Sequence, residues 1–157
     1  MLDYIDEPFR LYPLGRLDYD STGLLLLTND GSLTQSILHP KFEIEKVYEV
    51  TINKILPIET IKRLEKGVRI DNYRSAPCKI KVKSRNDNKK TMHLLVTIHE
   101  GKNREIRKLF KTADAEVIRL NRIKEANIEL GTLRQGEYRK LKPIEVVKLK
   151  KYLNINN

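Results

Sequence analysis

Cysteine and histidine are scarce in this chain of 157 residues, which contains one cysteine, Cys78, and three histidines. A single cysteine excludes an internal disulfide and also a zinc site built on a pair of cysteines. His93 and His99 share a predicted strand but would lie roughly 20 Å apart, too far to hold one metal ion. We therefore predict a reduced, cytoplasmic protein that binds no metal.

Long apolar runs are also missing, and no stretch approaches the length of a membrane-spanning helix. Residues 1–13 contain three acidic side chains and lack the apolar segment of a signal peptide. Positive charge, by contrast, is in excess: Lys and Arg number 31 and Asp and Glu 21, a formal net charge of +10. This excess favours a polyanionic partner: RNA, DNA or an anionic membrane surface. The membrane surface is the weakest of the three, because no basic amphipathic helix carries aromatic anchors.

Hydrophobic periodicity and turn residues predict more strands than helices. Strands are predicted at residues 9–14, 24–27, 46–52, 78–83, 92–98, 116–122 and 128–130. Helices are predicted at residues 33–38, 57–66, 104–112 and 143–153. Several strands follow one another through short turns, as in antiparallel hairpins. The predicted class is α+β, with a mixed and mainly antiparallel sheet flanked by a few helices.

The stretch GRLDYDSTGLLLLTNDG at residues 15–31 places one carboxylate, Asp18, between a cation and a run of four leucines. The leucines at 24–27, bounded by a glycine and a turn, are typical of a short strand buried on both faces. Ser21 and Thr22 favour a structured loop before that strand. On this local pattern alone the commoner interpretation is that Asp18 caps the loop, and a catalytic role is the alternative.

GRLD and GLLLLTNDG resemble the signature of the RsuA/RluB-type pseudouridine synthases, which isomerise uridine in ribosomal RNA, with Ser21 where that family usually has threonine. Further motifs follow in the order expected for the family: EKVYEV at 45–50, EGKNREIRKLF at 100–110, RLNRI at 119–123 and GEYRKL at 136–141. The resemblance therefore covers nearly the whole chain. It implies the pseudouridine synthase fold and an RNA pseudouridine synthase activity, with Asp18 of GRLD as the catalytic residue.

Pseudouridine formation breaks the bond between ribose C1′ and uracil N1, turns the base and rejoins it through C5. The reaction has no redox step, so we expect neither a cofactor nor a metal. It needs an ionised carboxylate, acting as nucleophile or as base, in a pocket that excludes water. The resemblance implies that Asp18 has this role with Arg107 as its ion-pair partner. We predict that Arg16 contacts RNA or displaces a base. The resemblance also implies that Tyr48 stacks on the flipped uracil and that Leu120 forms the opposite apolar wall.

Without the resemblance, these residues have plainer interpretations. Arg107 would be one of several solvated charges on a basic helix, and Tyr48 a half-buried tyrosine of a strand. In the predicted helix 104–112, basic side chains fall at i, i+3, i+4 and i+7, opposite an apolar face. We predict RNA contacts for basic residues in and near this helix and in the RLNRI motif: Lys102, Arg104, Lys108, Lys111, Arg119 and Arg122.

The chain departs from the family's pattern in three ways. Glu105 stands where the family usually has glutamine, and Ala126 where it usually has glycine. Many members also carry a separate small RNA-binding domain before this region, whereas residues 1–157 are predicted to form a single catalytic domain. Within it, residues 1–14 are predicted as a lead-in segment and first strand, and residues 154–157 as a disordered tail.

Two functions from different classes fit the composition: an RNA pseudouridine synthase, and a non-catalytic RNA-binding or ribosome-assembly module. Asp18 favours the enzyme, because a protein that only binds RNA has no need of a carboxylate beside phosphates. A metal-dependent nuclease is disfavoured, since Asp18 and Asp20 alone do not make a two-metal site. We expect a monomer that acts on ribosomal RNA or a pre-ribosomal particle, and more specifically on large-subunit RNA.

Overall fold

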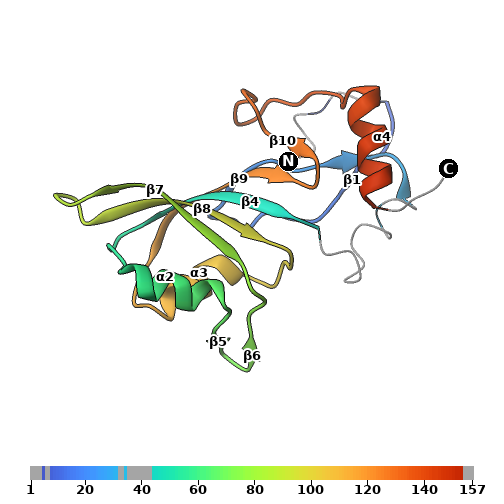
Figure 1. The fold of residues 1–157 in the computed structure, drawn as a ribbon. Coiled ribbons are helices and arrows are strands. Elements are labelled where there is room, and N and C mark those ends of the chain that lie inside the picture. Colours follow the sequence, from blue (N-terminus) through green and yellow to red (C-terminus); the bar gives the residue numbers. More distant parts are fainter. Residues whose placement is uncertain (1–4, 6–7, 32–33, 35–43, 154–157) are drawn as a thin grey trace.

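A six-stranded sheet forms the centre of the fold (Figure 1). The structure is a computed structural model that describes residues 5, 8–31, 34 and 44–153. Five strands lie antiparallel in the order β10, β9, β4, β8, β7, and β2 joins β9 in parallel. Their bounds are β2 Thr22–Gly23, β4 Lys46–Ile52, β7 Lys79–Asn86, β8 Thr91–Ile98, β9 Val117–Glu125 and β10 Ile128–Glu129. The predicted α+β class with a mixed, mainly antiparallel sheet is confirmed.

The central strand β4 shows why this sheet has one strongly buried face. Apolar side chains alternate along its sequence, KVYEVTI, so that Val50 and Ile52 are buried on the face that Tyr48 shares. Two helices, α2 (Ile58–Glu65) and α3 (Glu105–Lys111), lie on the same side of the sheet (Figure 1) and close the main core against it. The alternation predicted for residues 46–52 is confirmed.

Both helices bury the face that their spacing predicts. Their buried apolar side chains are Ile61, Leu64, Ile106, Leu109 and Phe110. Ile58, also predicted for the apolar face of the first helix, is 54% exposed, because the first residue of α2 lies outside the main core cluster.

A second, smaller core lies beside α4 (Pro143–Tyr152). Figure 1 shows α4 next to β1 and β10, away from α2 and α3. Leu14, Leu24 and Leu26 from the N-terminal stretch pack in this core together with Leu149 of α4. The GRLD stretch therefore joins the second core on one side to the sheet on the other.

The leucine run differs from its prediction. One strand is predicted over residues 24–27, whereas the structure has two short strands on either side, β2 and β3 (Leu27–Thr28). Leu24 and Leu26 are buried, and the other two leucines are only partly so. A strand buried on both faces is therefore wrong here, because the alternate leucines pack against the second core from one side only.

The remaining elements agree with their predictions or lie outside the described residues. The strand predicted at 9–14 shrinks to β1 (Tyr12–Pro13), which pairs with β3. The antiparallel hairpin of β7 and β8 is confirmed, with strands longer than predicted, and a small ribbon of β5 (Arg69–Ile70) and β6 (Tyr73–Arg74) precedes it. The prediction for 154–157 and, apart from Thr34, the prediction for 33–38 fall outside the described residues. No helix in the described ranges is long and apolar enough to cross a membrane.

Two residues with a positive φ lie beside β9, one on β2 and one directly after β9. Gly23 has a φ of +113°, and a Cβ there would lie 2.2 Å from the backbone oxygen of Arg122, so only glycine fits. Ala126, at the end of β9, has a φ of +52°, the left-handed region that favours glycine. This explains why a glycine is usual at that place of the motif, and it means that alanine is strained there.

Candidate active site

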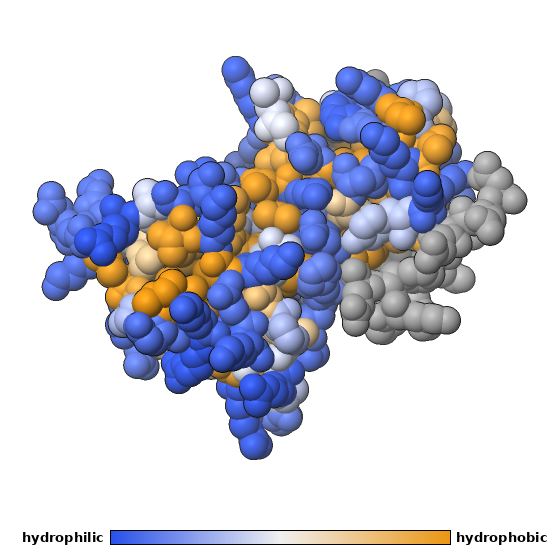
Figure 2. Space-filling view, viewed as in Figure 1, coloured by the Kyte–Doolittle hydropathy of each residue, from blue (hydrophilic) through white to orange (hydrophobic). Residues whose placement is uncertain are grey.

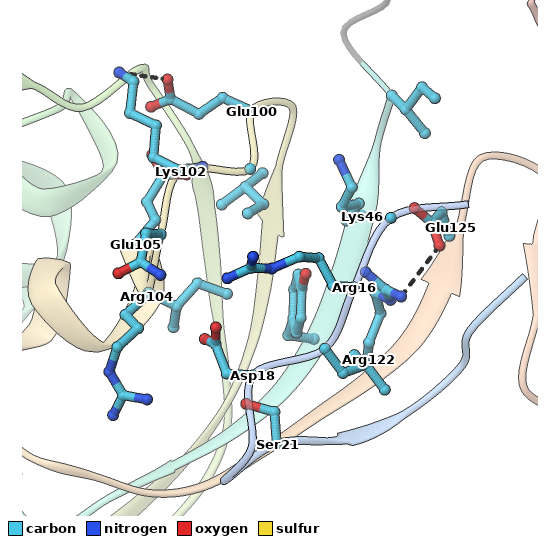
Figure 3. Close-up of a pocket in the computed structure, with 18 of the residues that line it drawn as sticks. Arg16, Asp18, Ser21, Lys46, Glu100, Lys102, Arg104, Glu105, Arg122 and Glu125 are labelled. Atoms are coloured by element: carbon cyan, nitrogen blue, oxygen red, sulfur yellow. Dashed lines mark hydrogen bonds and ion pairs between the residues drawn. The ribbon is translucent and has the colours of Figure 1, made fainter. Parts of the chain in front are cut away.

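A cleft of about 1110 Å³ opens between the GRLD stretch, β4, β9 and the segment that joins β8 to α3. Arg16, Asp18, Tyr48 and Leu120, four residues predicted for the site, all line it. In Figure 3 the side chains of α3 and its preceding loop stand on one side of the cleft, Arg122 and Glu125 on the other, and Asp18 between them. Figure 2 shows that hydrophilic side chains surround the apolar areas on the face drawn there.

Asp18 is held at the edge of this cleft by its own loop. The backbone N–H of Ser21 donates to the Asp18 backbone oxygen at 2.9 Å, which closes a turn with Tyr19 fully exposed at its tip. The loop then joins β9, where Thr22 Oγ1 donates to Asn121 Oδ1 at 3.0 Å. The predicted structured loop is thereby confirmed, and the carboxylate of Asp18 stays half-buried at the boundary between core and cleft.

The carboxylate that the α3 arginines bind is Asp20, at the rim of the cleft. Arg104 donates to both carboxylate oxygens of Asp20, each at 2.8 Å. Arg107 reaches the same residue, with its Nε 3.3 Å from Oδ2 and its Nη2 donating to the backbone oxygen at 2.6 Å. The hydrogen bonds from Arg104, and the charge of Arg107, hold the pKa of Asp20 below its usual range despite some desolvation.

This arrangement corrects the predicted ion pair between Arg107 and Asp18. In the described ranges no cation forms an ion pair with Asp18, and Arg107 divides its donors between Asp20 and the backbone oxygen of Val117, 2.7 Å away. The physical reason is that Arg104, the N-cap of α3, and Arg107, in its first turn, both reach the tip of the turn, two residues past Asp18. Together they fix the loop that carries Asp18.

The opposite wall comes from β4 and β9 and contains a second arginine–carboxylate pair. Tyr48 and Arg122 are direct partners across these strands, beside an irregularity in the register. Arg122 is only 2% exposed; its Nε donates to the backbone oxygen of Leu24 at 2.8 Å, and its Nη2 lies 3.4 Å from Oε2 of Glu125. The prediction that Arg122 contacts RNA phosphates is wrong, because its side chain points into the protein.

Burial governs the ionisation of the groups on this wall. Desolvation raises the pKa of Tyr48, which Arg122 partly opposes, and it also raises the pKa of Glu125 against the effect of Arg122 and Lys46. The pKa of Lys46 is lowered, first by desolvation and then by the charge of Arg122. The ionisable groups of this wall are therefore partly shielded from water where they border the cleft.

The segment between β8 and α3 presents two neighbouring acids, Glu100 and Glu105. Glu105 is buried, accepts from the backbone N–H of Lys102 at 3.2 Å and hydrogen-bonds with Glu100. Glu100 in turn accepts from the backbone N–H of Ala76 and from Lys102 Nζ, each at 2.7 Å. Burial and the neighbouring carboxylate raise the pKa of Glu105 to about 8. Burial also opposes ionisation of Glu100, yet its hydrogen bonds lower its pKa to about 2, so the pair keeps one proton at neutral pH.

The other residues predicted to bind RNA lie on or near the surface. Lys102, Lys111 and Arg119 are exposed, and Arg104 remains partly exposed beside Asp20. Lys108 is 3.1 Å from Asp71 in an ion pair. Sequence reasoning did not single out Asp20, Lys46, Glu100 and Glu125. Asp20 binds Arg104, 84 residues away, so no local pattern could pair them.

The described residues offer neither a metal-binding cluster nor an ionised thiol. The described residues contain no group of three or more His, Cys, Asp or Glu side chains that could hold a metal ion. Cys78 is free, and burial raises the pKa of its thiol to about 12, so it stays protonated. The ionisable side chains that line the cleft include Arg16, Asp18 and Tyr48.

A sequence model of the RNA pseudouridylate synthase family matches residues 2–112. The chain therefore belongs to the RNA pseudouridylate synthase family, and the resemblance seen in its motifs is confirmed. A crystal structure of a pseudouridylate synthase, 31% identical in sequence, superposes with a TM-score of 0.84 over 94% of this chain and 64% of that one.

Two curated relatives with assigned names are similar to most of this chain. The chain is 45% identical over 143 residues to ribosomal large subunit pseudouridine synthase B of Bacillus subtilis, covering 91% of this chain and 59% of that protein. It is 33% identical over 153 residues to the dual-specificity RNA pseudouridine synthase RluF of Escherichia coli, covering 98% of this chain and 51% of that protein. The chain thus spans between half and three fifths of the length of these relatives.

Proposed function

We propose that this protein converts a uridine of ribosomal RNA to pseudouridine, with Asp18 as the catalytic residue. The observation that carries the proposal is the position of Asp18, half-buried at the edge of a basic cleft that Tyr48 and Leu120 also line. Family membership supports the same chemistry. The similarity to a large-subunit RNA enzyme, 45% identical, favours large-subunit RNA as the substrate.

Under this proposal each part of the cleft has a task. A uridine flipped from its RNA enters between Tyr48 and Leu120, where an aromatic face replaces the stacking lost in the RNA. Asp18 acts on the ribose or the base, as nucleophile or as general base, while the N1–C1′ bond breaks and the C5–C1′ bond forms. The proton that leaves C5 is balanced by the one that N1 gains, so no redox partner is required. Arg16, exposed at the mouth, contacts the RNA.

The basic side chains around the cleft would hold the RNA backbone. Lys102, Lys111 and Arg119 are exposed, and Arg104 and Lys108 keep part of their charge accessible. Contacts of this kind bind RNA through phosphates and so position the substrate without reading its sequence. The choice of uridine then depends on the shape of the RNA that brings one flipped base over Asp18.

Release of tritium from C5 tests the proposal. Transcripts of large-subunit and small-subunit ribosomal RNA, each carrying uridine tritiated at C5, are incubated separately with the protein. We expect tritium release in an amount equal to pseudouridine formed, and from the large-subunit transcript. Asp18→Asn should reduce turnover by on the order of 10⁶ while RNA affinity changes by about twofold. Asp20→Asn is the matched control, because it removes a carboxylate of the same loop, and it should slow turnover by about tenfold only.

Three outcomes separate the alternatives. Asp18→Asn with more than about one per cent of the original turnover would remove Asp18 as catalyst. Release from the small-subunit transcript alone would overturn the choice of substrate but not the reaction. Tight RNA binding without release from either transcript would favour the non-catalytic RNA-binding module.

A further inference from the structure

Arg122 of β9 contacts the segment after the Asp18 loop and Glu125, and it is paired with strand β4. Its backbone oxygen accepts from the N–H of Leu24 at 2.7 Å, and its Nε donates to the oxygen of Leu24 at 2.8 Å. The segment that follows the Asp18 loop is therefore held on both sides by one residue. Across the sheet, Arg122 is the direct partner of Tyr48 on β4, and its positive charge opposes the rise that burial causes in the pKa of the Tyr48 hydroxyl.

The ion pair between Arg122 and Glu125 has features that are unfavourable for stability. Both side chains are almost fully buried, 2% and 3% exposed, which makes their dehydration costly. Their closest atoms are 3.4 Å apart, and neither Arg122 Nη2 nor Glu125 Oε2 has a hydrogen-bond partner among the described residues. A buried polar atom left without a partner calls for another explanation, and a functional role is one.

The backbone of β9 is irregular beside Arg122. The pairing of β4 with β9 changes register between Val47 and Tyr48, so the extra residue of β9 lies next to Arg122. Such bulges bend a strand and redirect the side chains beside them, and they are frequent next to active sites. Here the redirected pair is Tyr48 and Arg122, both of which line the cleft.

We propose that Arg122 is a positioning residue that fixes the Tyr48 ring relative to the Asp18 loop. It acts through Tyr48 and Leu24 and does not itself contact the reacting atoms. With the guanidinium in place, the ring that receives the flipped base and the carboxylate of Asp18 keep one separation. This inference rests on the proposed function for its effect on turnover, and on the contacts alone for its effect on the Tyr48 hydroxyl.

A double-mutant cycle with Arg122→Lys and Tyr48→Phe tests the effect on turnover. Each single variant should lower kcat by about tenfold, the expected loss of one hydrogen bond to a charged group, with little change in KM. If Arg122 acts through the Tyr48 hydroxyl, the double variant should be no more than about threefold slower than the worse single variant. Independent roles would multiply to about a hundredfold loss, and that result would overturn the proposal.

Ultraviolet titration of tyrosine provides a readout that needs no catalysis. Subtracting the titration of Tyr48→Phe from that of the unchanged protein isolates Tyr48. Since the Arg122 charge opposes the rise in the pKa of Tyr48, weakening the contact by Arg122→Lys should move that titration to higher pH. An unmoved titration would show that the two groups do not interact. Arg69→Lys, on the exposed face of β5, is the matched control and should leave both turnover and titration unchanged.

A second variant protects the test against loss of folding. Glu125→Gln leaves Arg122 in place but removes the charge that faces it, so it should lower kcat by about threefold, again without adding to Tyr48→Phe. A fall in RNA affinity with an altered salt dependence, and no change in kcat, would instead return Arg122 to the phosphate contacts. Failure of the unchanged protein to release tritium would contradict the proposed function. The Tyr48 titration would still decide whether Arg122 positions that ring.

Discussion

The cleft has two arginine–carboxylate clusters of the same chemistry in opposite surroundings. At the rim, Arg104 and Asp20 form two hydrogen bonds of 2.8 Å with side chains that are each 42% exposed. On the opposite wall, Arg122 and Glu125 are buried and 3.4 Å apart. The pair with the better geometry is thus the one in contact with water, and the pair with the looser geometry is the one whose burial costs most.

The difference shows that ion pairs serve two purposes in this site. The rim pair loses little hydration and contributes little to stability. Its bidentate hydrogen bonding, however, orients the turn after Asp18. The buried pair holds a charge that the fold cannot release to solvent, so loss of one partner leaves the other unpaired in the core. Changes at the rim should therefore alter RNA binding and rate, and changes at the buried pair should first alter stability.

The largest stability effect is expected from Arg122→Met. Removing the cation leaves Glu125 buried without its partner, which should lower the free energy of unfolding by about 3–5 kcal/mol. Urea denaturation followed by circular dichroism measures this loss. The double variant Arg122→Met with Glu125→Leu removes both charges and should recover at least half of the loss, because two apolar side chains pack without dehydration cost. A double variant less stable than the single one would show that the pair is a true source of stability.

Gly23→Ala should rank second, because Gly23 carries the rim loop onto the strand of the buried pair. Its φ of +113° and the 2.2 Å approach of an added Cβ to the backbone oxygen of Arg122 leave no room for alanine. We expect a loss of about 3 kcal/mol in the free energy of unfolding. Gly131→Ala is the matched control, with a φ of +59° but no atom within 4 Å of the added Cβ, and it should cost about 1 kcal/mol. Equal losses in the two variants would mean that backbone strain, and not the contact with β9, sets the effect.

Glu105→Gln should change the dependence of stability on pH. In the folded protein the pKa of Glu105 is raised to about 8, above the value of about 4.3 for an unfolded chain. The folded state therefore binds more protons between these values, and stability falls as pH rises through this window. Glutamine donates to Glu100 without titrating, so the stability of the variant relative to the unchanged protein should rise by on the order of 2 kcal/mol from about pH 5 to about pH 8.5.

Other ionisable groups near Glu105 could also contribute to the pH dependence of stability. The ionisable groups that interact with it or share its surroundings are Glu100, Lys102, Tyr73, Cys78 and Lys46. The pKa of Glu100 is lowered to about 2, so its contribution is lost only as pH falls below about 4.3 and does not overlap this window. Thermal or urea unfolding of both proteins across the range measures the difference. Parallel curves would show that Glu105 titrates normally.

The smallest stability effect is expected from Arg104→Met at the rim. The midpoint of thermal unfolding should stay close to that of the unchanged protein, because exposed ion pairs contribute little. RNA binding should weaken for all sequences, and the slope of log affinity against log salt should fall by about 0.7–0.9 in magnitude if Arg104 neutralises one phosphate. Lys111→Met, on the same helix but without an ion pair to the loop, should show the same slope and faster turnover than Arg104→Met. Identical rates would mean that the Asp20 contact does not orient Asp18.

Local pattern was enough for the regular elements and for the position of Asp18. The alternation in residues 46–52 and the apolar spacing of α3 predict β4 and the buried face of that helix, because burial of one face requires those periods. The GRLD motif and its following leucines identify the loop and the family. These features depend on neighbours within a few residues, so the sequence by itself determined them.

The partners of the charged residues were decided by the tertiary structure. Arg119 and Arg122 belong to one motif on β9. They are three residues apart, so the sequence predicts that they lie on opposite faces of the strand but not which face is buried. The Arg122 side chain is buried and contacts the Leu24 backbone and Glu125, whereas Arg119 is exposed. In the same way, Arg107 meets Asp20 and not Asp18 because a turn 87 residues away in sequence reaches α3 with its tip first. Charges attract at any sequence separation, so the pairing of each one depends on where the whole chain brings its partners.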